Sequence, residues 1–135
     1  MVEAAGADII EVGIPFSDPL ADGVTIQRST QAALDQGMTA ARVLELIHQA
    51  ALRIPVVIMT YLNPVLAYGL DRFLVDAHAA GASGLLLTDF PAGADPELER
   101  RVTASPLASI RLVAPTTTTA ARGARGGQAP VASST

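Results

Sequence analysis

Short apolar runs alternate along this chain with stretches in which apolar residues recur at helical spacing. Runs rich in branched aliphatic residues predict buried strands near residues 7–12, 55–60, 84–88 and 110–114. Between them, one-sided apolar stripes predict helices over 24–36, from a cap at 39 to about 51, over 70–80, and from 96 to about 102. Apolar strands that alternate with helices are typical of parallel βαβ units, so the pattern predicts an α/β fold.

Both ends of the chain depart from this pattern. Residues 2–6, "VEAAG", are typical of the last turn of a helix closed by glycine, and beyond Pro115 the only large aliphatic residue is Val131. So little apolar surface does not offset the entropy of ordering, and we expect residues 119–135 to be disordered. Residues 1–118 are then a partial domain, because four parallel strands in series leave edges that need partners or cover.

The composition is that of a globular protein and excludes several kinds of function. Of 135 residues 50% are hydrophobic and 16% are charged, and the net charge is -4. The acidic balance argues against nucleic acid as the main partner, because phosphate binding needs clustered basic side chains. All basic residues are arginine and there is no cysteine, which excludes a Schiff-base lysine and thiolate chemistry. No apolar run reaches the roughly 18 residues of a membrane span and no signal peptide opens the chain, so we expect a cytoplasmic protein.

The stretch "EVGIPFSDPLADG", residues 11–23, places carboxylates directly after the first predicted strand. In parallel α/β proteins functional side chains gather at the C-terminal ends of strands, which is where Glu11 lies. Alternation puts Glu11 on the opposite side of the strand from Ile10 and Val12. Burial of a carboxylate predicts a raised pKa, which suits general acid and base work, or a charged partner. The pattern leaves open a Glu that points to solvent or pairs with an arginine.

Other carboxylates have simpler structural explanations. Asp22 precedes a glycine and a predicted helix, which favours an N-cap role that is compatible with ligand binding. Asp18 precedes a proline and favours a turn. Asp18, Asp22 and Asp89 could suggest a magnesium site, but no spacing supports it, and we predict no metal.

The remaining polar groups are no more specific. Tyr61 ends the second predicted strand, where it either lines a pocket or belongs to the core with a solvated hydroxyl. His48 and His78 fall in predicted helices without a second ligand at useful spacing, and we expect them on the surface. The glycines of "RGARGG" follow no strand and precede no helix, so they predict no phosphate loop.

Longer motifs resemble one family. "GADIIEVGIPFSDPLADG" followed by "TIQRS", then "MTYLNPVLAYG", "GASGLLLTDFP" and "RLVAPTTT", are similar to the tryptophan synthase alpha chain family over residues 2–118. The resemblance implies a (β/α)8 TIM barrel of which this chain holds a part. It also implies the retro-aldol cleavage of indole-3-glycerol phosphate to indole and glyceraldehyde 3-phosphate, a lyase step in L-tryptophan biosynthesis. No cofactor is implied for this chain, since pyridoxal phosphate belongs to a beta chain partner in an alpha2-beta2 tetramer.

The resemblance also implies roles for single residues. Glu11 matches the general acid and base, and Asp22 matches the carboxylate that accepts the indole N–H. Residues expected to line the indole pocket are Ile58, Tyr61 and Leu86. Residues expected to face the beta chain are Phe16, Asp18, Pro19 and Asn63.

Departures from the family put activity in doubt. Val24 stands where the family usually has proline, and a (β/α)8 barrel needs about 250 residues. The first strand, the phosphate site and the mobile closing loop have no counterpart, and the tail loses its patterning as a shifted reading frame would produce. We therefore expect a truncated or misread product that is inactive alone. The alternatives are a non-catalytic module that docks the beta chain, and another phosphate-binding barrel enzyme.

Overall fold

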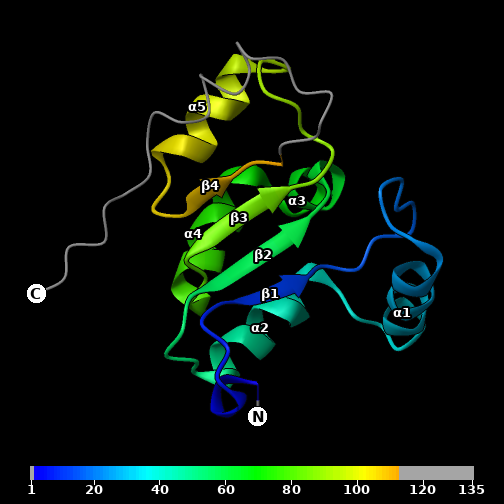
Figure 1. Ribbon diagram of the computed structural model, residues 1–135. Helices are drawn as coiled ribbons and strands as arrows, with labels where there is room; N and C mark the ends of the chain where they lie inside the picture. Colours follow the sequence, from blue (N-terminus) through cyan, green and yellow to red (C-terminus); the bar gives the residue numbers. More distant parts are fainter. Residues whose placement is uncertain (1, 113–135) are drawn as a thin grey trace, which may run out of the picture.

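The computed structural model describes residues 2–112. Within this range the strands β1 (Ile10–Gly13), β2 (Val56–Thr60), β3 (Gly84–Leu87) and β4 (Ala108–Ile110) form one sheet in sequence order. All three neighbouring pairs are parallel, and Figure 1 shows the arrows running in one direction. The predicted series of parallel strands is confirmed.

Helices connect the strands. Between β1 and β2 lie α1 (Val24–Asp35) and α2 (Ala40–Ala50), and between β2 and β3 lie α3 (Leu62–Tyr68) and α4 (Leu70–Ala80). The helix α5 (Pro96–Ala104) precedes β4. The predicted helix boundaries hold to within two residues for α1, α2, α4 and α5.

Capping residues explain where several of these helices begin and end. The Thr39 side chain accepts the Arg42 N–H at 3.3 Å and starts α2, as its position in the sequence predicts. Gly81 ends α4 with a φ of 107°, a conformation that favours glycine. At the N-terminal end a single 3-10 turn, Glu3–Ala5, is closed by Gly6 with a φ of 92°, which agrees with the terminal helix turn read from residues 2–6.

The hydrophobic core lies on one face of the sheet, against α2, α3 and α4 (Figure 1). Ile58, Val65 and Phe73 contribute fully buried side chains from β2, α3 and α4. Leu98 and Val102 extend this core to α5. Burial of these stripes accounts for the helical spacing of apolar residues in the sequence.

The other face of the sheet carries Glu11. Register pairs Glu11 with Val57 and Gly13 with Met59, so side chains of this alternate set share the face opposite to the core. Among the described elements, α2, α3 and α4 lie behind the sheet in Figure 1, while α1 stands to one side beyond β1. No residue of α1 is buried.

Two predictions about the fold need correction. The sequence predicts the fourth strand near residues 110–114, whereas β4 is Ala108–Ile110. Its three residues pair in register with Gly84, Leu85 and Leu86. The sequence pattern predicts no element over residues 62–68, which form α3. Pro64 is tolerated there because it lies in the first turn, where a backbone N–H has no helical acceptor. The predicted disordered tail lies outside the described residues.

Candidate active site

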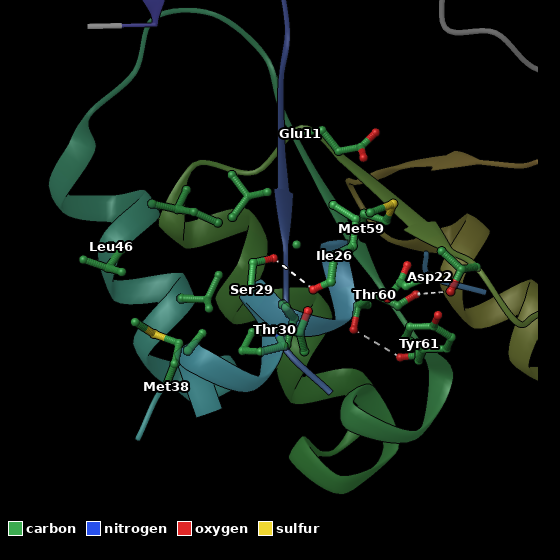
Figure 2. A pocket seen from close by; sticks show the side chains of 18 of the residues that line it. Glu11, Asp22, Ile26, Ser29, Thr30, Met38, Leu46, Met59, Thr60 and Tyr61 are labelled. Atoms are coloured by element: carbon green, nitrogen blue, oxygen red, sulfur yellow. Dashed lines mark hydrogen bonds between the residues drawn. The ribbon is translucent and has the colours of Figure 1, made fainter. Parts of the chain in front are cut away.

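A cavity of about 560 Å³ lies between α1 on one side and β1, β2 and α2 on the other. Glu11, Asp22 and Tyr61 all contribute to its lining. Figure 2 places Glu11, Asp22 and Tyr61 toward one side of the cavity and Met38 and Leu46 toward the other. The cavity therefore joins a polar end to an apolar end, as small-molecule sites often do.

Glu11 is held by the β1–β2 ladder. The backbone N–H groups on either side of it, those of Ile10 and Ile14, donate to Pro55 and Met59 at 2.9 and 3.0 Å. Its side chain is exposed, and within residues 2–112 it makes no hydrogen bond or ion pair. The expected burial or arginine partner is therefore absent from the described structure, because β1 is an edge strand and no described helix covers this face. The carboxylate is free to meet a ligand.

Asp22 lies in the loop between β1 and α1 and is half-buried. The prediction that it caps α1 is wrong, because the helix begins at Val24, so that the N-cap is Gly23, and no side chain caps this end. The Asp22 backbone carbonyl accepts the Gln27 side-chain amide at 2.9 Å, while its carboxylate makes no hydrogen bond to the described residues. This carboxylate is likewise available to the cavity.

Tyr61 anchors the loop that carries Asp22. Its side chain is buried at 4% exposure, and its hydroxyl accepts the Ala21 N–H at 2.9 Å. Its ring lies 5.4 Å from that of Phe16, in a tilted arrangement. Tyr61 therefore combines both interpretations left open by the sequence, since it is buried and it also lines the cavity.

The other two residues expected in the indole pocket do not line this cavity. Ile58 is fully buried in the core against the helices, on the face of the sheet away from Glu11, so it does not line the cavity. Met59, the next residue, lines the cavity instead. Leu86 pairs with Met59 and shares its face, but it lies outside the cavity lining. Alternation from Tyr61 back to Met59 was the sequence signal that could have found this residue.

The residues expected to face a beta chain lie on or near the same loop. Asp18 and Asn63 are exposed, and the Ser17 hydroxyl donates to Asp18 at 2.6 Å. Phe16 and Pro19 are half-buried and line a second, smaller hollow against α1.

Asp89 has a structural role that its local sequence does not predict. Its carboxylate accepts the Leu62 N–H at 2.7 Å and so serves the N-terminus of α3 from the end of β3. Across residues 2–112 no group of three His, Cys, Asp or Glu side chains could hold a metal ion. His48 and His78 are exposed on α2 and α4, as predicted. None of the helices described is long and apolar enough to cross a membrane.

Comparison with known proteins identifies the family. Residues 1–124 match the family model described as "Tryptophan synthase alpha chain". Relatives of that name from Carboxydothermus hydrogenoformans and Granulibacter bethesdensis are 53% and 48% identical over 116 and 117 residues. The crystal structure of tryptophan synthase subunit alpha from Legionella pneumophila matches with a TM-score of 0.85 at 38% identity. Tryptophan synthase from M. tuberculosis, in its aminoacrylate-bound form, matches with a TM-score of 0.80 at 41% identity.

The coverage of these matches is unequal. The matches cover 84% of this chain for both relatives, and 90% and 87% of it for the two structures. They cover only 42% to 43% of the relatives' own length and 48% of the length of each structure. The chain thus spans less than half the length of the curated relatives it matches. Its four parallel strands correspond to part of the (β/α)8 barrel of those structures. The chain belongs to the tryptophan synthase alpha chain family.

Proposed function

We propose that this chain carries the two catalytic carboxylates of a lyase that cleaves indole-3-glycerol phosphate to indole and glyceraldehyde 3-phosphate. The observation that carries the proposal is that Glu11, in β1, and Asp22, in the loop before α1, line one cavity with apolar walls. Neither carboxylate makes a hydrogen bond or ion pair with another described residue. Family membership supplies the reaction.

The reaction needs an acid at one ring position and an anion at another. Glu11 delivers a proton to the indole carbon that bears the glycerol chain, which makes the ring cationic. Asp22 accepts the indole N–H and stabilises that charge. The bond from this carbon to the chain then breaks and its electron pair returns to the ring. The chain hydroxyl gives its proton to the Glu11 carboxylate, now the general base, as it becomes the aldehyde. The apolar end of the cavity favours an aromatic ring over water.

The proposal includes a partner. Leu20, in the same loop as Asp22, is 92% exposed and lies beside Asp18 and Pro19, two of the residues that the family resemblance places toward a beta chain. The family resemblance makes a tryptophan synthase beta chain the partner, in an alpha2-beta2 tetramer. Pyridoxal phosphate belongs to that beta chain, and this chain uses no cofactor of its own. A cytoplasmic location is part of the proposal.

Indole release from indole-3-glycerol phosphate tests the function. The full chain is assayed alone and with a purified family beta chain, beside its Glu11→Gln variant, which keeps shape and loses the acid. Turnover that requires Glu11 supports the proposal. Turnover that is unchanged by Glu11→Gln removes this residue from the mechanism and argues against it.

A docking module without catalysis is the second candidate, and the observation that favours it is that the chain spans less than half the length of its curated relatives. This candidate predicts that the chain binds beta chain but releases no indole. A Leu20→Asp variant separates the two activities, because it places a charge in the contact and leaves both carboxylates of the cavity in place. Binding that Leu20→Asp abolishes, in a protein without turnover, would favour the docking module.

A further inference from the structure

The loop that carries Asp22 has few anchors of its own. It leads into α1, which has no buried residue and therefore contributes little to fixing the loop. Within the described residues, the long-range hydrogen bond to this loop joins the Ala21 N–H to the Tyr61 hydroxyl, across 40 positions of sequence. The Phe16 and Tyr61 rings add a second contact at 5.4 Å. Tyr61 therefore meets the loop at two points, one of them next to Asp22.

Tyr61 is itself fixed in place. It follows β2 directly and is the N-cap residue of α3, and its side chain is 4% exposed. The first helical N–H after it, that of Leu62, is held by Asp89 at 2.7 Å. A loop that hydrogen-bonds to such a residue takes its position from the sheet.

We propose that Tyr61 is a positioning residue, whose hydroxyl holds the backbone at Ala21 and thereby holds the Asp22 carboxylate at the cavity. This role is additional to that of a cavity wall, because it belongs to the hydroxyl oxygen, which accepts a backbone N–H, and not to the ring. The inference rests on the proposed function for the role of Asp22. A net hydrogen bond worth about 0.5–1.5 kcal/mol changes the local opening of the loop about 2- to 13-fold.

Amide hydrogen exchange tests the contact without reference to activity. Tyr61→Phe keeps the ring against Phe16 and removes the hydroxyl. Tyr68→Phe is the matched control, since it removes a hydroxyl that donates to Asp76 at 2.7 Å, away from the cavity lining. We expect the Ala21 amide to exchange about 2- to 13-fold faster in Tyr61→Phe and unchanged in Tyr68→Phe. Equal Ala21 exchange in wild type and Tyr61→Phe would overturn the proposal.

A double-mutant cycle on indole release tests the action through Asp22. We expect Tyr61→Phe to lower kcat about 2- to 13-fold with little change in KM, because the charge that Asp22 stabilises develops in the transition state. In an Asp22→Asn background Tyr61→Phe should then cost little more. Full additivity of the two losses would overturn the positioning role. If no variant turns over, wild type included, the proposed function fails while the exchange result still decides whether Tyr61 holds the loop.

Discussion

Removal of the Asp89 carboxylate should destabilise the protein although the side chain is exposed. Asp89 accepts the Leu62 N–H at 2.7 Å and joins the end of β3 to the start of α3, across 27 positions of sequence. The Tyr61 N-cap supplies no side-chain bond of its own to α3. An Asp89→Ala variant therefore leaves the helix without this acceptor and weakens the link between two strand ends.

The expected size follows from the kind of contact. Loss of a helix cap costs about 0.5–2 kcal/mol. A hydrogen bond to a charged group contributes about 1.5–3 kcal/mol, a value that solvent exposure reduces. We expect the free energy of unfolding to fall by about 1–2 kcal/mol. With a urea dependence of about 2 kcal/mol per molar, the unfolding midpoint falls by about 0.5–1 M.

Urea unfolding followed by circular dichroism measures this midpoint. Asp89→Asn should lie close to wild type, because asparagine caps a helix about as well as aspartate. Asp8→Ala is the control for loss of an exposed carboxylate, since Asp8 makes no hydrogen bond or ion pair to residues 2–112. If Asp89→Ala unfolds at the same urea concentration as Asp8→Ala, the contact does not support the fold and the reasoning is refuted.

Three further predictions concern the site, the pH response and the core. If activity is measurable, Glu11→Gln should lower kcat by about 10²–10⁴-fold, and Asp22→Asn should also lower it; steady-state indole release measures both, and near-wild-type rates would contradict the assignment. The hydrogen bond to Asp76 and burial raise the Tyr68 pKa above its ordinary value of 10.0. Because the folded state holds the proton more tightly, this stabilisation is complete below about pH 10 and is lost as the pH rises through the raised pKa. Urea midpoints measured on both sides of about pH 10 should therefore fall less for Tyr68→Phe than for wild type. Phe73→Ala should cost about 3–5 kcal/mol of unfolding free energy, since the ring is fully buried, and a loss below about 1 kcal/mol in urea unfolding would contradict its place in the core.

Apolar periodicity was sufficient to predict most of the fold. The strand β2 is buried at four of five positions, and the apolar face of α4 buries Phe73, Leu74 and Ala77 in the core. Because buried positions are apolar, both elements show a clear apolar pattern in the sequence. The helix α3 has a weaker apolar pattern, because it has one buried residue, Val65, and a proline that usually indicates a loop. Its N-terminus depends on Asp89, which lies 27 residues away and leaves no local signal.

The site was predictable in part, for the same physical reason. A strand position determines on which face a side chain lies, so Glu11 could be placed opposite to Val12 from alternation alone. The same rule applied from Tyr61 indicates Met59 rather than Ile58, and the choice of Ile58 came from the resemblance. Neither the start of α1 nor the Ala21 contact follows from alternation. The capping role assigned to Asp22 failed because α1 begins at Val24, which makes Gly23 and not Asp22 the N-cap residue.

The two carboxylates lie on backbone segments of different stability, and this difference predicts the order in which the site loses its geometry. Glu11 lies within a parallel ladder whose backbone bonds open only when β1 leaves the sheet. Asp22 lies in a loop that depends on one hydrogen bond and one ring contact to Tyr61, next to a helix with no buried residue. Segments with few buried contacts open at lower free energy than the strands beside them. Loss of the Asp22 geometry should therefore precede global unfolding, while Glu11 keeps its place on the sheet until the core around Phe73 gives way.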